Sequence, residues 1–248
     1  MRLIICLFLF SLLAAGPGVR GAEKPIRAVL ITGGCCHNYE FQSQAITQAI
    51  GKVAKVEWTV LLDPRKGTRG EIDLYKKANW AADFDIAIHN ECFADTTDPE
   101  YIRSITEGHK AGLPAMVIHC AMHTYRGAKI DDWREFLGVT SRRHDHMAKY
   151  PVKPAAADHP VMKGFPEVWV TPSDELYIID KLWPNAKALA TSVSERDGKT
   201  YPVVWVNQYG KARVFGTTFG HADETFRDPV FLNLLGQGFL WAASSGEK

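Results

Sequence analysis

The chain has 248 residues, of which 46% are hydrophobic and 23% are charged, and its formal net charge is +1. Acidic and basic residues are mixed with no basic block, which argues against a protein that binds nucleic acid or an anionic membrane surface. Small-molecule chemistry is therefore the leading class of function.

The N-terminus has the pattern of a secretory signal peptide, which we expect at residues 1–22. Arg2 precedes an apolar run at residues 3–15, and Gly21 and Ala22 then offer a cleavage site. The run is too short for an integral membrane span, which needs about 20 apolar residues. We expect the remainder, residues 23–248, to be one periplasmic or secreted domain.

The first half of the mature chain predicts alternating strands and helices. Apolar residues recur at helical spacing from Phe41 to Val53, and Asp98 with Pro99 begins a second helix, 99–111, that Gly112 closes. Strands are expected at 26–31, 56–62, 84–88 and 115–118, and the nearly all-apolar first and the last are expected to be buried. This order predicts right-handed crossovers and an α/β fold with a mainly parallel, doubly wound sheet.

Beyond Phe136 the pattern changes to shorter strands and proline-rich turns. Asp228 and Pro229 begin a last helix, apolar nearly all round, that extends to Ala243. Further strands are expected at 150–153, 188–193, 201–206 and 212–217, the last two joined as a hairpin.

Four cysteines follow the leader: Cys35, Cys36, Cys92 and Cys120. An even number in an oxidising compartment suggests two disulfides. However, three of them lie at the ends of predicted buried strands, and neighbouring Cys35 and Cys36 rarely bridge each other without strain. We therefore favour semi-buried thiols.

Histidines gather where a binding site is expected. In an open α/β sheet, ligands bind beyond the carboxyl ends of the strands. The residues that follow predicted strands are His37, His89, His119, His123 and His221, and His144 and His146 lie two apart on one face of an extended segment. We expect His37, His119 and His221 to meet, because separate loops bring them to one edge, and we add His123 and His146 as candidates.

The candidate carboxyl groups are Glu91, beyond the third strand, and the neighbouring pair Asp174 and Glu175. Their ordinary alternative is a loop cap or a surface ion pair. His109, near the end of a helix, is expected to interact with the helix dipole only.

Two more specific chemistries, a cysteine nucleophile and a metal site, each require a particular spacing of residues. A nucleophilic Cys120 after a central strand is typical of Cys-His hydrolases, but a tight elbow needs small residues where Ile118 and Met122 stand. A divalent metal such as zinc, held by His37, His221 and another histidine or Glu91, suits the ligand types, although only the spacing of His119 and His123 supports it.

Several segments resemble the ThuA-like, or trehalose-utilisation, family over residues 26–243. They are ITGGCCHNY, VIHCAMHTY, ADHPVMKGFPEVWVTPSDELY, PVVWVNQYGKARVFGTTFGH and the final FLWAA. The resemblance implies the fold of the class I glutamine amidotransferase-like superfamily, a flavodoxin-like three-layer sandwich, without its Cys-His-Glu triad. It also implies a role in disaccharide catabolism, beside oxidoreductases that make 3-keto sugars.

The positions that match the polar signature of the family are His37, His119, Asp174, Glu175 and His221. We expect a lyase, hydrolase or isomerase that acts on a keto-disaccharide or related sugar by acid/base chemistry. His221 or His37 would be the base, Glu175 or His119 the acid or a sugar contact, and a metal or cationic imidazole would polarise the ketone. The expected substrate contacts are Glu91, His123, His146 and Asp174.

The main alternative is a sugar-binding module without catalysis, in which tryptophans stack on the sugar. Most of these tryptophans are expected in the core instead. The expected partner is a small sugar, with no nucleic acid, and a homodimer is allowed. The tryptophans considered for stacking on the sugar are Trp58, Trp80, Trp133, Trp169, Trp183 and Trp205.

Overall fold

The computed structural model describes residues 24–244, so the expected signal peptide at 1–22 lies outside the described residues. The described part contains a nine-stranded sheet and a two-stranded sheet. The α-helices are α1 (Tyr39–Gly51), α2 (Pro99–Ala111), α3 (Asp132–Leu137) and α4 (Pro229–Ala243). The strands are β1 (Ile26–Gly34), β2 (Val56–Asp63), β3 (Ile86–Cys92), β4 (Ala115–Ile118), β5 (Val139–Ala148), β6 (Pro151–Pro154), β7 (Trp169–Val170), β8 (Asp174–Leu182), β9 (Ala186–Val193), β10 (Thr200–Tyr209) and β11 (Ala212–Thr217).

The nine-stranded sheet has the order β2-β1-β3-β4-β11-β10-β9-β6-β7. The five strands from β2 to β11 pair in parallel, and the remaining pairs are antiparallel. β1, β3 and β4 are rich in fully buried aliphatic residues, as expected for strands that are covered on both faces. The prediction of an α/β fold with a mainly parallel sheet is therefore confirmed.

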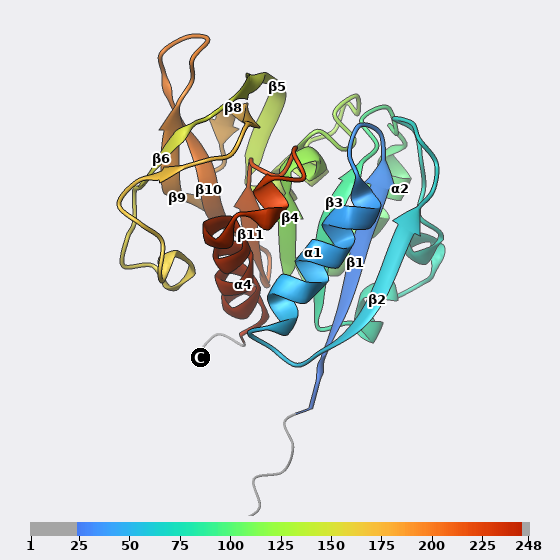
Figure 1. Cartoon of the computed structure of the whole chain (residues 1–248). Helices are drawn as coiled ribbons and strands as arrows, with labels where there is room; N and C mark the ends of the chain where they lie inside the picture. The colour runs from blue at the N-terminus through green and yellow to red at the C-terminus, as the bar shows by residue number, and fades with distance from the viewer. Residues whose placement is uncertain (1–23, 245–248) are drawn as a thin grey trace, which may run out of the picture.

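Helices cover both faces of the sheet, which makes a three-layer sandwich (Figure 1). α1 and α4 pack against each other and against one apolar cluster, which includes Ile46, Leu235 and Phe239. α2 and α3 pack over the opposite face, where Ile105 and Phe136 belong to a second cluster. The sheet thus separates two hydrophobic cores.

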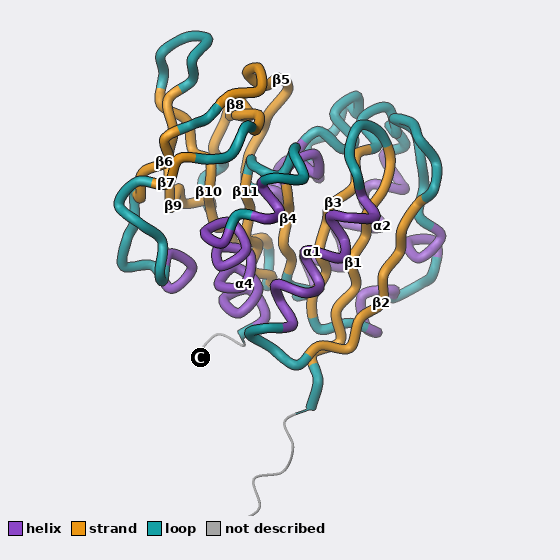
Figure 2. The backbone as a smooth tube through the Cα atoms, viewed as in Figure 1, coloured by secondary structure: helices purple, strands orange, loops and turns teal. Residues whose placement is uncertain are grey.

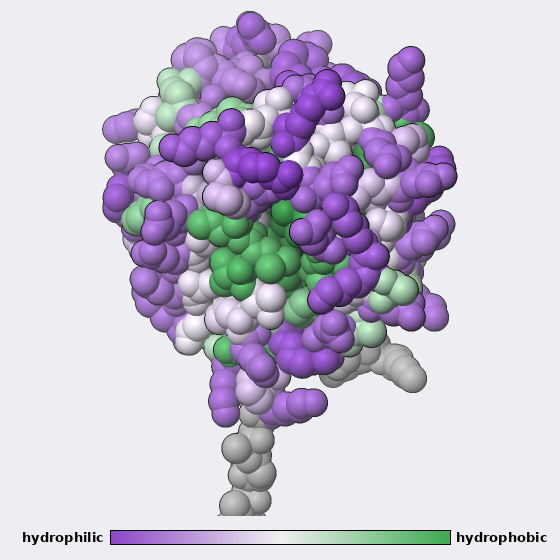
Figure 3. All heavy atoms as spheres, turned by 90° about the vertical axis from the view of Figure 1, so that its right-hand side faces the viewer, coloured by the Kyte–Doolittle hydropathy of each residue, from purple (hydrophilic) through white to green (hydrophobic). Residues whose placement is uncertain are grey.

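The edge formed by β2 presents apolar side chains to solvent. Val60 and Leu62 are 44% and 43% exposed, and Figure 3 shows hydrophobic residues gathered in the middle of this face among hydrophilic ones. Within residues 24–244, no helix is long and apolar enough to cross a membrane.

The helix boundaries follow the capping signals in the sequence. α2 begins after Asp98, whose carboxyl group accepts a hydrogen bond from the Glu100 amide, and it ends at Gly112, whose φ is 138°. β3 is longer than expected, because the chain stays extended through His89, Asn90 and Glu91. β5 and β8, which form the small sheet, were not predicted.

The carboxyl ends of the parallel strands meet at one edge of the sheet, where loops gather (Figure 2). After β1 the chain turns through residues 35–38 into α1, and after β4 it enters a short 3₁₀ helix, His119–Met122. The small sheet of β5 and β8 also reaches this edge, since β5 contacts that 3₁₀ helix. The architecture thus brings segments far apart in the sequence to one place.

Candidate functional site

Three histidines converge at this edge. His37 lies in the loop after β1, His119 directly after β4, and His221 in the loop after β11. Their ring centroids are 4.9 Å apart for His37 and His119, 4.8 Å for His37 and His221, and 5.5 Å for His119 and His221. We call these three residues the histidine cluster. The convergence predicted from strand order is therefore present.

The ring of His119 is held in one orientation. Its Nδ1 lies 2.7 Å from the carbonyl oxygen of Thr218, so Nδ1–H donates to that oxygen and Nε2 faces the cluster. The backbone of His119 has φ of 47°, a left-handed conformation that a non-glycine residue seldom adopts. Such outliers persist where the surrounding structure holds them, often at functional sites.

Asp174 and Glu175, at the start of β8, point to opposite sides of the strand. Asp174 is buried and accepts hydrogen bonds from the backbone amides of Gly220 and His221, at 3.0 and 3.1 Å. It also accepts one from the Thr225 hydroxyl. Asp174 therefore anchors the loop that holds His221, and it does not face the cluster as a substrate contact would.

Glu175 faces the imidazoles. Its Oε2 lies 3.2 Å from His221 Nδ1 and 3.7 Å from His119 Nε2, and its Oε1 lies 3.4 Å from His144 Nδ1. The Glu175 side chain is only 12% exposed. One carboxyl group thus lies within 4 Å of three imidazoles, and the nitrogen of His221 is close enough to exchange a proton with it directly.

The protonation of the cluster is uneven. Burial, and then the proximity of His221, lowers the pKa of His37 to about 4. Burial, followed by the neighbouring His37, lowers the pKa of His119 well below its usual value. Glu175 beside His221 raises the pKa of that imidazole. Two of the three imidazoles are therefore neutral at pH 7.

The histidine cluster fits a divalent metal. Each residue offers one ligand nitrogen, and these atoms all lie within 4.8 Å of one another. Both ring nitrogens of His37 are buried without a hydrogen-bond partner among the described residues. A neutral imidazole with a free nitrogen is the form that binds zinc, and ligating histidines usually direct their other nitrogen at a carbonyl or carboxylate. His119 does so toward the Thr218 carbonyl, and Nδ1 of His221 lies 3.2 Å from Glu175.

Three of the expected substrate contacts lie elsewhere. Glu91 is fully buried and its Oε1 lies 2.9 Å from Nδ1 of His89. His123 is buried and stacks on Tyr177, while its Nε2 lies 3.1 Å from the Ser141 hydroxyl. His123 does not belong to the group of nitrogens that His37, His119 and His221 bring together.

His146 points away from the cluster. Its side chain is 65% exposed and its Nε2 lies 2.9 Å from Glu195. His144 and His146 do not act as a same-face pair, because the pairing of β5 with β8 shifts between His144 and Met147. As a result His144, not His146, reaches Glu175.

Tyr177 is a site residue that the sequence analysis missed. Its hydroxyl lies 3.3 Å from His119 Nε2, and its ring centroid lies 4.5 Å from that of His119 and 4.0 Å from that of His123. The signal was the spacing of Glu175 and Tyr177, which places both on one face of a strand. That signal could be used only once β8 was recognised.

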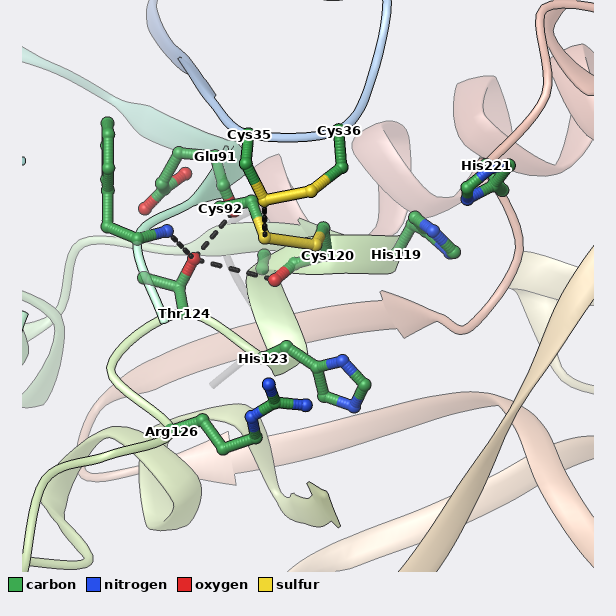
Figure 4. Close-up of a disulfide and its surroundings, with 12 residues drawn as sticks. Cys35, Cys36, Glu91, Cys92, His119, Cys120, His123, Thr124, Arg126 and His221 are labelled. Carbon is green, nitrogen blue, oxygen red and sulfur yellow. Dashed lines mark hydrogen bonds between the residues drawn. A yellow bond between two sulfur atoms is a disulfide. The ribbon is translucent and has the colours of Figure 1, made fainter. Parts of the chain in front are cut away.

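The cysteines are paired, so the expectation of free thiols was wrong. Cys35 bonds to Cys36, and Cys92 bonds to Cys120 (Figure 4). β3 and β4 lie side by side, so the second pair joins the end of β3 to the 3₁₀ helix that follows β4. While it is paired, Cys120 has no thiolate to act as a nucleophile.

A large hollow of about 1170 Å³ lies apart from the cluster. It is bordered by the end of β2 and the following loop, including Leu61, Asp63 and Leu74. Its lining contains neither the histidine cluster nor Glu175. The volume of a hollow therefore does not by itself identify the place where the ionisable side chains converge.

The family model named ThuA, described as trehalose utilisation, matches residues 27–242. The chain belongs to the ThuA family. A search of the curated proteins finds no match to it.

Solved structures share the ThuA fold. A ThuA-like protein from Parabacteroides merdae is 21% identical, with a TM-score of 0.72 over 91% of this chain and 93% of that one. A second, from Bacteroides uniformis, is 19% identical, with a TM-score of 0.65 over 92% and 95%. A GMP synthase protein from Thermoplasma acidophilum is 11% identical, with a TM-score of 0.54 over 88% and 96%. The last agrees with a glutamine amidotransferase-like, flavodoxin-like fold.

Proposed function

We propose that this ThuA-family protein is an exported, cation-dependent enzyme that acts on a keto-disaccharide or a related sugar. The observation that supports this best is the convergence of three imidazoles from separate loops, with ligand nitrogens within 4.8 Å of one another and Glu175 beside them. The family, described as trehalose utilisation, supports a sugar as the substrate. Export rests on the leader at residues 1–22.

His37, His119 and His221 would hold the cation. When bound, a zinc-class ion would polarise a carbonyl or hydroxyl oxygen of the sugar. Burial keeps His37 and His119 neutral, as ligands must be. The Thr218 carbonyl orients His119, and the buried Asp174 holds the backbone of His221, so the site is built before substrate arrives.

Glu175 would move the proton. A keto group acidifies the hydrogen on the neighbouring carbon, and a positioned carboxyl group can accept that proton. The C–H electron pair then forms a C=C bond as the glycosidic bond breaks, and the same proton passes from Glu175 to the departing oxygen. Water adds to the unsaturated product in a second step. His144 and His221 hold the Glu175 side chain from two sides.

The test is turnover of a keto-disaccharide with product analysis by chromatography. Replacing His37 or His221 by Ala should lower the rate about 10²- to 10⁴-fold. His146→Ala is the matched control, because His146 is an exposed histidine whose side chain pairs with Glu195 on the surface. Unchanged turnover in both cluster variants would reject the proposal.

Calorimetry separates an enzyme from a binding module. A binder gives heat and leaves the sugar intact, whereas an enzyme gives new products. The buried state of Trp80, Trp133, Trp169 and Trp205 leaves few rings free for sugar stacking, which supports the enzyme.

A further inference from the structure

The four cysteines form a second group of reactive side chains beside the histidine cluster. Cys35 and Cys36 lie in the loop after β1, Cys92 ends β3, and Cys120 lies in the 3₁₀ helix after β4. The sheet fixes this arrangement, because Gly34 pairs directly with Cys92 in the register of β1 and β3. The cysteines therefore meet for the same topological reason as the histidines.

The two disulfides touch each other. Sγ of Cys35 lies 3.8 Å from Sγ of Cys92, and Figure 4 shows Cys35 facing Cys92 from the loop. Gly34, with φ of 97°, allows this approach, because a Cβ there would lie 2.3 Å from the Cys92 carbonyl oxygen. This contact places one sulfur of each disulfide against the other, and thiol–disulfide exchange proceeds by attack of one such sulfur on another.

Exposure falls along the series of sulfur-bearing residues. Cys36 is exposed and Cys35 is half-buried. Cys92 and Cys120 are buried, at 3% and 6% exposure. A reductant in solution can thus reach the Cys35–Cys36 disulfide, while the Cys92–Cys120 disulfide is covered.

We propose that the four cysteines form a thiol–disulfide exchange site, which takes two electrons from an external dithiol at Cys36 and passes them to the buried Cys92–Cys120 pair. Nothing in this proposal depends on the sugar chemistry. The co-reactant is a protein or small-molecule dithiol, which leaves as a disulfide.

Each step is an attack of a thiolate on a disulfide. The external dithiol first reduces Cys35–Cys36 and is itself oxidised. The Cys35 thiolate then attacks Sγ of Cys92, which forms a Cys35–Cys92 bond and releases Cys120 as a thiolate that takes up a proton. Cys36 finally attacks Cys35, restores the Cys35–Cys36 bond and releases Cys92 as a thiol. Two electrons and two protons have moved to the buried pair.

Two single variants give a matched test. Cys36→Ser leaves Cys35 free beside Cys92, so exchange should produce a Cys35–Cys92 cross-link and move the free thiol to Cys120. Cys35→Ser leaves Cys36 free, which lacks that contact, so the free thiol should stay on Cys36. Alkylation with iodoacetamide under non-reducing conditions, followed by peptide mass spectrometry, locates the thiol. A free thiol that stays on Cys35 in Cys36→Ser overturns the proposal.

The wild-type protein provides a test that does not depend on how the variants fold. A short pulse of limiting dithiothreitol, quenched with N-ethylmaleimide, should trap a Cys35–Cys92 cross-link with Cys36 and Cys120 alkylated. Reduction of Cys92–Cys120 should also be about tenfold slower in the Cys35→Ser/Cys36→Ser variant, since a direct attack must reach buried sulfurs. Reduction of the buried pair at the same rate, with no trapped cross-link, would also overturn it.

Discussion

The described part of the molecule has two groups of neighbouring histidines, and they differ in what their ring nitrogens contact. His89 and His109 are fully buried, with their Nε2 atoms 3.0 Å apart. Nδ1 of His89 faces Glu91 at 2.9 Å, and Nδ1 of His109 donates to the Leu113 carbonyl at 2.8 Å. In the histidine cluster, by contrast, both nitrogens of His37 lack a partner among the described residues.

This contrast shows that burial and proximity do not by themselves mark a site. Both groups contain close imidazoles, and burial lowers the pKa of His109 as it does that of His119. Every ring nitrogen of His89 and His109 already contacts the protein, so these two histidines stabilise the core between α2 and β3. The histidine cluster keeps nitrogens available for a ligand, and this is the property that predicts chemistry.

The largest expected effect is on catalysis. Glu175→Gln keeps the size of the side chain but removes the proton acceptor, so turnover of a keto-disaccharide should fall about 10²- to 10⁴-fold. Circular dichroism should remain unchanged, because Asp174, not Glu175, anchors the loop. Wild-type turnover in this variant would show that the carboxyl group has no part in the reaction.

Substitutions in the buried pair of His89 and His109 should change the free energy of unfolding and not catalysis. His89→Leu leaves Glu91 and His109 without their partner, and each buried group left unsatisfied costs about 1–3 kcal/mol. Urea unfolding measures the loss. His146→Leu is the exposed control, which should stay within about 0.5 kcal/mol of wild type. If His89→Leu abolishes turnover while remaining as stable as wild type, the distinction between the two groups is wrong.

Cation binding should also distinguish the histidine cluster from His89 and His109. Zn²⁺ at a hundred times its Kd should stabilise the wild-type protein by about 2.7 kcal/mol, because it binds the folded state. The same stabilisation should appear in His89→Leu and be lost in His37→Ala. Thermal unfolding with and without Zn²⁺ provides the measurement, and equal stabilisation of all three proteins would place the ion outside the histidine cluster.

The last prediction concerns pH. Burial lowers the pKa of His123 to about 3, whereas an unfolded histidine titrates near 6.5. The unfolded chain therefore binds a proton first, and stability is lost as pH falls from 6.5 toward 3, by about 1.4 kcal/mol for each pH unit. His123→Phe should unfold with a shallower pH dependence between pH 6.5 and 4.5.

Asp174 also titrates in this pH range, but it does not affect the difference between wild type and His123→Phe. Burial raises its pKa to about 6, so its contribution to stability falls as pH rises through that region, which is the opposite sign. Because Asp174 is present in both proteins, its contribution cancels in the difference between wild type and His123→Phe. An unchanged slope in the variant would mean that His123 is protonated in the folded protein.

Local signals in the sequence were sufficient for much of the fold. The Asp98–Pro99 start and the Gly112 end predicted α2 at its observed boundaries. The rule that loops after parallel strands share one edge predicted that His37, His119 and His221 converge. Both inferences depend on short-range chemistry or on general topology, which a single sequence contains.

The small sheet could not be predicted in the same way. β5 has the sequence VTSRRHDHMA, in which polar and charged residues hide the apolar alternation of a strand. Its irregular pairing with β8 decides that His144 reaches Glu175 and His146 does not, and such irregularities depend on tertiary contacts. The cysteine pairing likewise depends on which loops the sheet order brings together.

The opposite orientations of Asp174 and Glu175 make the register of β8 a functional property. Sliding β8 by one residue would turn Asp174 toward the histidine cluster and Glu175 toward the loop that Asp174 anchors, although composition and charge would be unchanged. Exchanging the two residues as Asp174→Glu/Glu175→Asp would not be conservative for the same reason. Any redesign that lengthens this strand upstream of the pair must therefore add residues by twos.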